Sequence, residues 1–138
     1  MGPSLDITKN TALTLLDCSN NKLTDLNIVD STRLETLLCY KNKITSLDLS
    51  KDTNLIFVSC NENMLTSIDI SKNNKLTALY VFNNSLSALD VSKNTELRAL
   101  TCEKSAPMNS RRIELRGTKL LSIGLKEPRT WRRRFTSA

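Results

Sequence analysis

The chain has 138 residues, of which 39% are hydrophobic, and this length is typical of one domain. It contains no histidine and only three glycines, so the usual nucleophile–base pairs and glycine-rich phosphate loops are excluded. We therefore predict that the protein is not an enzyme and holds no cofactor. No apolar run reaches the roughly 18 residues of a membrane-spanning helix.

The formal net charge of +6 is unevenly distributed along the chain. Residues 1–104 carry 11 Lys and Arg against 12 Asp and Glu, whereas residues 105–138 carry nine basic and two acidic side chains. This composition divides the chain into a nearly neutral region, 1–104, and a basic C-terminal region, 105–138. We therefore do not expect the protein to bind nucleic acid, since only the tail has the positive charge for it.

The N-terminus begins Met-Gly-Pro-Ser and has neither a basic n-region nor an apolar h-region, so no signal peptide is predicted. The first apolar residues, Leu5 and Ile7, enter the pattern of the following segments halfway through. The resulting bare edge predicts self-association, because unpaired edges offer free backbone groups to other chains.

Residues 13–96 are organised by a repeat of 21 residues with no insertion. The pattern is L-x-x-L-x-C-x-x-N-x-L-x-x-L-x-[IVL], and a fifth copy begins before failing after residue 104. A fixed period of this length is the mark of a stacked repeat array. The copies begin at Leu13, Leu34, Leu55, Leu76 and Leu97.

Each copy contains a short stretch with period-two alternation, such as Val58-Ser59-Cys60, which predicts a half-buried strand. One coil cannot bury its apolar edge alone, so successive coils must stack, with equivalent strands about 4.8 Å apart in a parallel sheet. The return segments have turn composition, which predicts turns or 3₁₀ pieces and little helix. The asparagines at 21, 42, 63 and 84 follow each strand, where an amide side chain can satisfy several turn backbone groups.

These repeats resemble leucine-rich repeats in their short form, with seven matching positions in each copy. Within that family they are most similar to internalin-type bacterial surface proteins whose repeats carry a cysteine ladder in place of Leu. The resemblance covers about three quarters of the chain. It implies a right-handed solenoid of about five coils with a parallel sheet on its concave side, an extracellular or cell-surface setting, and a role in adhesion.

The four cysteines share one position of the repeat, and Val81 fills the same position in the fourth copy. A position that accepts Val requires a small apolar side chain, so we interpret these residues as buried free thiols of low reactivity. A zinc site is disfavoured because no closely spaced ligand pair is present, and disulfides between neighbouring coils are the remaining alternative. The cysteines are Cys18, Cys39, Cys60 and Cys102.

The aromatic residues of the repeats all fall at positions that point away from the core, onto the concave face. Contiguous exposed apolar side chains mark interaction sites, and Tyr is enriched among interface hot spots. Packing between neighbouring strands and docking of another part of a longer protein are the alternatives. The expected ligand-binding residues are Leu38, Tyr40, Phe57, Asn61, Glu62, Tyr80 and Phe82.

A row of acidic residues (Asp6, Asp48, Asp69 and Asp90) also recurs with the period. Calcium requires six or more converging oxygens, and a lysine follows three residues after each of Asp48, Asp69 and Asp90. We therefore expect a structural row and no metal site.

The basic region 105–138 loses the repeat spacing while its arginine content rises. Three interpretations remain open: a non-native extension, a C-terminal cap, or a functional basic tail that includes Trp131 and Phe135. In the cap interpretation, residues 112–115 and 120–125 pair as a hairpin around Gly117-Thr118.

Together these features predict a module that binds a protein or glycoprotein ligand through its concave aromatic face. The alternative is a structural spacer from a longer repeat array, with no ligand of its own. Neither the ligand nor the number of repeats in a parent protein follows from these residues.

Overall fold

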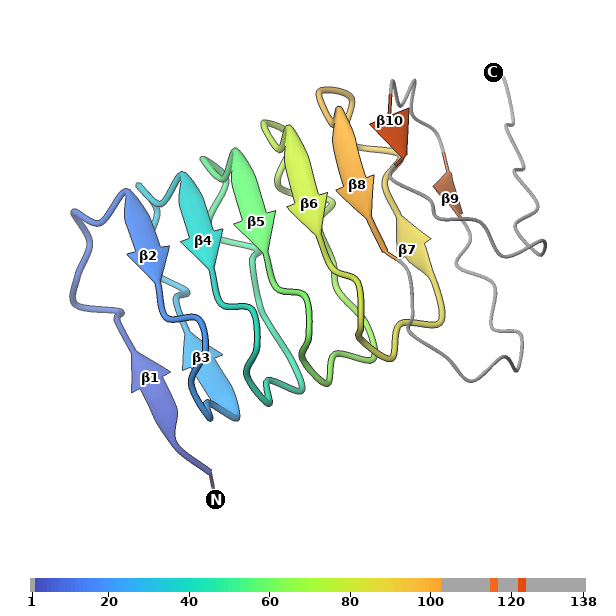
Figure 1. Cartoon of the computed structure of the whole chain (residues 1–138). Helices are drawn as coiled ribbons and strands as arrows, with labels where there is room; N and C mark the ends of the chain where they lie inside the picture. Colours follow the sequence, from blue (N-terminus) through green and yellow to red (C-terminus); the bar gives the residue numbers. More distant parts are fainter. Residues whose placement is uncertain (1, 103–114, 117–121, 124–138) are drawn as a thin grey trace.

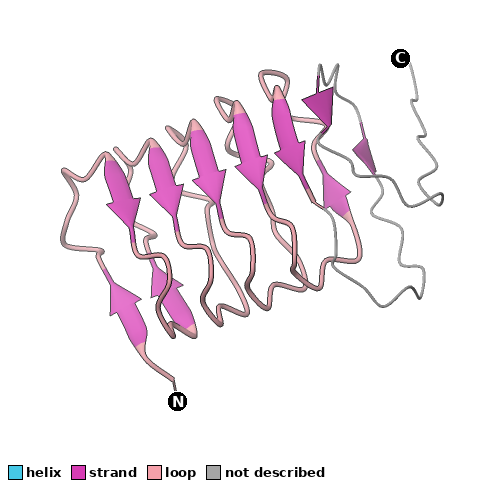
Figure 2. Cartoon of the chain, in the orientation of Figure 1, coloured by secondary structure: helices cyan, strands magenta, loops and turns pink. Residues whose placement is uncertain are grey.

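The computed structural model describes residues 2–102 together with the short strands at 115–116 and 122–123. Ten strands follow one another along the chain, and the described residues contain no helix (Figure 2). The strands are β1 (Ser4–Asp6), β2 (Leu15–Asp17), β3 (Asp25–Asn27), β4 (Thr36–Leu38), β5 (Phe57–Ser59), β6 (Ala78–Tyr80), β7 (Leu89–Asp90), β8 (Ala99–Thr101), β9 (Leu115–Arg116) and β10 (Ser122–Ile123).

The chain winds as a parallel β-solenoid of about five turns (Figure 1). Its main sheet has six strands in the order β10-β8-β6-β5-β4-β2, and two smaller sheets, β1-β3 and β7-β9, lie on the return side of the coils. The register repeats from coil to coil: Leu37 pairs with Val58, and Val58 pairs with Leu79. Equal spacing in the sequence therefore becomes side-by-side placement in space, as the 21-residue period predicts.

The apolar positions of the repeat form the core. In the second coil (34–54), third coil (55–75) and fourth coil (76–96) every apolar position of the template is at most 9% exposed. In the first coil (13–33), Leu13, Leu16 and Leu23 are only partly buried, because no full coil covers them. Burying one such side chain stabilises the fold by about 1.5–3 kcal/mol, and stacking is what makes that burial possible.

In the second, third and fourth repeats, the asparagine joins its own coil to the preceding one and also satisfies backbone groups of the turn. The Asn63 side chain accepts a hydrogen bond from the Ile44 amide at 3.0 Å. Its Nδ2 donates to the carbonyls of Cys39 at 3.0 Å and Cys60 at 3.1 Å. Asn42 and Asn84 repeat the arrangement in their coils. The predicted structural role is confirmed.

The residue before each of these asparagines has a left-handed backbone. Asn20, Lys41, Glu62 and Asn83 have φ values of 56°, 54°, 55° and 54°. Asparagine tolerates this conformation well, whereas Lys41 and Glu62 adopt it at a cost, since a Cβ crowds the following carbonyl. The turn after the strand is therefore imposed by the stacked coils.

A second column of polar side chains is buried on the return side of the coils. Asn73 and Asn94 are fully buried, and each donates Nδ2 hydrogen bonds to two carbonyls of the preceding coil. Asp52 and Ser31 occupy the corresponding positions in the second and first coils and are also 0% exposed. This column was not among the features that we predicted.

The C-terminal strands continue the two kinds of sheet. β9 pairs parallel with β7, with Leu115 beside Leu89, and β10 pairs parallel with β8, with Ile123 beside Leu100. The hairpin expected between 112–115 and 120–125 is wrong for these strands, since each bonds to the preceding coil and belongs to a different sheet. The rest of the basic region lies outside the described residues.

Candidate binding face

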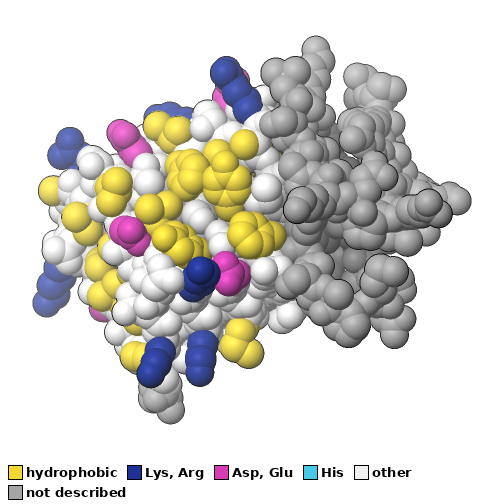
Figure 3. Space-filling view, in the orientation of Figure 1, with side chains coloured by type: hydrophobic (Ala, Val, Ile, Leu, Met, Phe, Trp, Pro, Cys, Tyr) yellow, Lys and Arg dark blue, Asp and Glu magenta, His cyan; other side chains and the backbone are white. Residues whose placement is uncertain are grey.

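The open face of the six-stranded sheet carries the side chains that alternate with the core. Figure 3 shows apolar side chains gathered over the middle strands of this face, with charged groups mainly around them. The apolar members come from β4, β5, β6 and the residues that follow these strands, in three successive coils. We call this surface the aromatic face, and it consists of Leu38, Tyr40, Phe57, Asn61, Glu62, Tyr80 and Phe82.

Two of its rings contact each other directly. The ring centroids of Phe57 and Tyr80 are 5.3 Å apart with an interplanar angle of 60°, an edge-to-face arrangement. The register explains the contact, because the direct partners of these residues are small: Phe57 lies beside Ala78, and Tyr80 beside Ser59. Rings on diagonal positions of neighbouring strands then reach across the space that small side chains leave.

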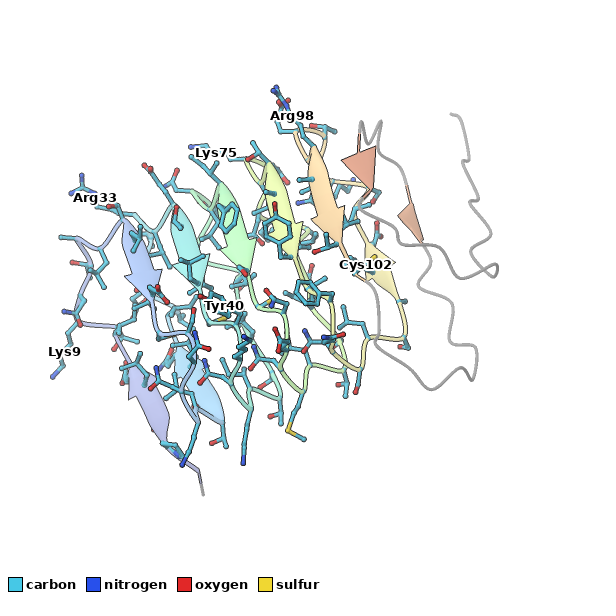
Figure 4. The ribbon with its side chains drawn as sticks, viewed as in Figure 1. Lys9, Arg33, Tyr40, Lys75, Arg98 and Cys102 are labelled. Carbon is cyan, nitrogen blue, oxygen red and sulfur yellow. The ribbon has the colours of Figure 1, made fainter. Side chains whose placement is uncertain are left out.

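The backbone ladder extends past the strand ends and places Tyr40, Asn61 and Phe82 side by side. The Lys41 amide donates to the Asn61 carbonyl at 3.0 Å, and the Glu62 amide donates to the Phe82 carbonyl at 2.9 Å. Tyr40 and Phe82 are therefore two strand spacings apart, about 9.6 Å. Figure 4 labels Tyr40, whose partly buried ring belongs to the second coil.

Between the second and fourth coils lies a polar strip, formed by Ser59 and Asn61 on the third coil. Ser59 Oγ donates to Asn61 Oδ1 at 2.7 Å, and Asn61 Nδ2 donates to Glu62 Oε1 at 3.4 Å. Both side chains belong to the open face, yet Ser59 is 7% and Asn61 6% exposed. Larger side chains flank them on both sides in the sheet register, namely Leu38 and Tyr40 on the second coil and Tyr80 and Phe82 on the fourth.

The structure thus brings all seven expected residues onto one surface, but it places them differently with respect to solvent. Six of them are partly buried and so present part of their surface to a partner. Asn61 is buried, and its amide is engaged with Ser59 and Glu62. We infer that Asn61 orients Glu62 and does not itself offer a free amide.

The open face has a further exposed apolar residue beside the seven of the aromatic face. Leu15, on β2, is 56% exposed and lies in register beside Thr36 on the same sheet. Its position in the repeat is that of Phe57 two coils later, and this equivalence is the signal that places it on the open face. Leu15 therefore carries the apolar surface toward the N-terminal coil.

The acidic row closes turns on the return side. Each carboxylate accepts a hydrogen bond from the amide two residues later, which is a turn-capping contact. The acceptors are Asp6, Asp48, Asp69 and Asp90, whose Oδ1 atoms lie 2.9, 2.9, 2.9 and 2.8 Å from the amides of Thr8, Ser50, Ser71 and Ser92. Among the described residues, no three acidic, cysteine or histidine side chains come together as a metal site.

Hydrogen bonding lowers the pKa values of Asp6, Asp48 and Asp69. The bonds from Ser50 lower the pKa of Asp48 below its ordinary value, and the nearby charge of Lys51 adds to the effect. The bonds from Ser71 lower the pKa of Asp69 in the same way, again with help from a lysine, Lys72. These carboxylates thus have a structural role, as expected, and the structure identifies that role as capping the turns.

The cysteine column lies in the core, and each cysteine directly follows a strand of the main sheet. Cys18, Cys39, Cys60 and Cys102 are all buried thiols, and no disulfide joins them. Burial raises the pKa of Cys60 to about 12. Burial also raises the pKa of Cys18 to about 11, with a smaller contribution from the charge of Asp17. The column packs as part of the core, which confirms its interpretation as buried free thiols and excludes the disulfide alternative in this structure.

A solved structure that matches this chain also contains a column of cysteines. The functional domain of InlJ from Listeria monocytogenes, which includes a cysteine ladder, matches with a TM-score of 0.70 and 38% identity over 85% of this chain. In fold and sequence the chain therefore resembles an internalin-type leucine-rich-repeat solenoid. It spans 23% of the length of that InlJ chain, about a quarter.

Other comparisons give no further relatives. No protein-family model matches the chain, and no curated protein matches it. In the described part of this internalin-like solenoid, no helix is long and apolar enough to span a bilayer.

Proposed function

We propose that this internalin-like solenoid is a binding module that recognises a protein or glycoprotein ligand through its aromatic face. The observation that carries the proposal is the gathering of Tyr40, Phe57, Tyr80 and Phe82 on one open surface of the sheet, all four only partly buried. A core-forming role would place such rings in the interior, which is filled instead by Leu, Ile, Val and Cys.

The chemistry of the surface favours binding over catalysis. Aromatic side chains provide large contact area at low conformational cost and dominate interface hot spots. Glu62 adds a charged acceptor beside the rings, held by Asn61. The chain has no histidine, so no imidazole base adjoins the rings.

We further propose that the module acts on a bacterial surface or as part of a secreted protein. Support comes from its likeness to the InlJ domain, because the resemblance of its repeats to internalin-type surface proteins implies an extracellular setting. The small number of coils limits the area that a ligand can cover, so we expect an affinity on the order of micromolar.

The test is a binding screen of the full chain against extracellular proteins and glycoproteins, beside a variant with Phe57, Tyr80 and Phe82 changed to Ala. Hot-spot truncations typically cost 2 kcal/mol or more, so the variant should bind a captured ligand at least about 30-fold more weakly. Met64→Ala is the matched control, because Met64 is 55% exposed but lies outside the strands of the open face. The Met64→Ala variant should bind the captured ligand with unchanged affinity.

Circular dichroism and thermal unfolding of both variants separate binding from packing. If the triple variant loses the ligand while keeping its spectrum, the aromatic face is the recognition surface. If it keeps the ligand, the proposed face is wrong. A ligand lost only on changing Arg132, Arg133 and Arg134 to Ala would move binding to the basic tail. A chain with no ligand in the screen would be a spacer.

A further inference from the structure

Asp52 occupies a place in its coil that asparagine occupies in the next two coils. Asn73 Nδ2 donates to the carbonyls of Leu49 and Asp52, both at 3.0 Å. Asn94 Nδ2 donates to the carbonyls of Ile70 and Asn73, both at 2.9 Å. Each amide therefore bridges to the preceding coil through two carbonyl oxygens.

In the same register, the two carbonyls that correspond to Asp52 are those of Ile28 and Ser31 in the first coil. Both already close turns, accepting backbone bonds from the Ser31 and Leu34 amides. Asp52 is 0% exposed, and both of its carboxyl oxygens are buried without a hydrogen-bond partner. The Ser31 hydroxyl is likewise buried without a partner, so it does not supply the missing donor.

An ionised carboxylate cannot replace the amide in this column. Carbonyl oxygens accept hydrogen bonds and a carboxylate only accepts, so ionised Asp52 faces oxygen atoms with no hydrogen between them. A protonated carboxyl has one O–H donor and regains one of the two bonds that Asn73 and Asn94 make. The column therefore selects the protonated form of Asp52.

The charged neighbours act in the same direction. Asp30 from the first coil and Asp48 from the same coil lie close enough to influence the group, and both are acidic. On the side of the third coil the contact is with neutral Asn73, through the Asp52 carbonyl. Burial, with smaller contributions from the charges of Asp48 and Asp30, raises the pKa of Asp52 to about 6.

We propose that Asp52 is a proton-dependent link between the first and second coils, which binds the preceding coil through its carboxyl proton in acid and loses that bond when it ionises. The sign follows from linkage. The folded protein holds the proton more tightly than the unfolded chain, whose carboxyl has its ordinary pKa of 3.8. The contribution of Asp52 is therefore fully present below about pH 4 and is lost as the pH rises through about 6.

The test compares the pH dependence of unfolding between the wild type and Asp52→Asn, which puts the amide of Asn73 and Asn94 into the second coil. Denaturant unfolding from pH 3.5 to pH 8 should show the variant to be more stable at neutral pH. The ratio of the two unfolding constants should change by up to tenfold per pH unit between about pH 4 and pH 6. Because only the ratio matters, titrations common to both proteins cancel.

The reciprocal variant, Asn73→Asp, moves the carboxyl one coil along. It should be destabilised at neutral pH and recover in acid, even though the surrounding acidic residues differ. Carboxyl ¹³C NMR titration of the wild-type chain gives a reading that needs no variant, and Asp52 should titrate well above the exposed aspartates.

Two results would overturn the link: a stability ratio that does not vary with pH, or an Asp52 that titrates with the exposed aspartates. A rise in wild-type stability on adding calcium, absent in Asp52→Asn, would also overturn it, since a cation and not a proton would then bridge the oxygens.

Discussion

At the scale of single residues, the coils are joined by amide side chains that replace backbone contacts. Asn63 satisfies one backbone donor and two nearby carbonyls, and these groups come from two different coils. Buried backbone groups left without partners cost free energy, so one side chain stabilises a turn and a junction together. These two roles explain why every complete repeat has asparagine at this position, although the other residues of the turn differ between coils.

Removing this amide should be costly only where coils meet on both sides. We predict that Asn63→Leu lowers the free energy of unfolding by about 1–3 kcal/mol, because it leaves the Ile44 amide and two carbonyls without their partner. Chemical denaturation monitored by circular dichroism measures the change.

Asn21→Leu is the control, since Asn21 is exposed and bonds only to carbonyls of its own coil. A loss of the same size in both variants would show that turn formation, and not the junction, is the source of the stability.

At the scale of elements, each coil contributes one residue to every column that runs along the solenoid. The column of Cys18, Cys39, Cys60, Val81 and Cys102 shows what such a column requires, because all five are buried. Volume and polarity, and not thiol chemistry, decide which residues fit, since Val81 stands among cysteines.

Two substitutions separate these requirements. Cys60→Val should change the free energy of unfolding by less than about 1.5 kcal/mol, because volume is nearly conserved. Cys60→Ser should cost about 1–3 kcal/mol, because it buries a hydroxyl in an apolar column. Equilibrium unfolding of the two variants under reducing conditions provides the comparison, and equal losses would instead assign the thiol a specific role.

Much of the fold could be predicted from the sequence because, with a fixed period, residues 21 apart in the sequence lie side by side in adjacent coils. The core positions, the parallel register and the role of Asn42 and its equivalents followed in this way. The placement of β9 and β10 did not, because Leu115 lies 26 residues after its partner Leu89, and Ile123 lies 23 after Leu100. The spacing Leu120-x-x-Ile123-x-Leu125 does match the start of a repeat and could have signalled that pairing.

The residues of the aromatic face were predicted from the sequence, but the exposure of each side chain was not. Burial of Asn61 depends on the size of the side chains in the coils before and after it, which pattern alone does not convey. The column that contains Asp52 was missed because its residue types change from coil to coil: Asn10, Ser31, Asp52, Asn73 and Asn94. A constant apolar type is easy to detect at period 21, and a mixed polar column is not.

At the scale of the whole molecule, stability passes from neighbour to neighbour, as in other repeat arrays. The strands of the final coil each have a described partner: β9 pairs with β7 and β10 pairs with β8. A shortened chain ending at residue 104 would leave β7 and β8 as open sheet edges.

We predict that this shortened chain has a lower free energy of unfolding than the full chain and self-associates more readily, because unpaired edges accept strands from other copies. Denaturant unfolding measures the first effect and sedimentation velocity over a range of concentrations measures the second. Equal stability of the two chains would favour the interpretation of 105–138 as an extension without a structural role.

Because the register of the coils is uninterrupted, equivalent surface residues of successive coils are separated by a constant distance. The remainder of a residue number after division by 21 gives its row, and the quotient gives its place along the axis, in steps of about 4.8 Å. Duplicating the third coil would therefore move Tyr80 and Phe82 one strand spacing further from Tyr40, and every residue would keep its row. Ligand reach on such a surface is set in whole steps, so evolution can adjust it by copying coils without redesigning any contact.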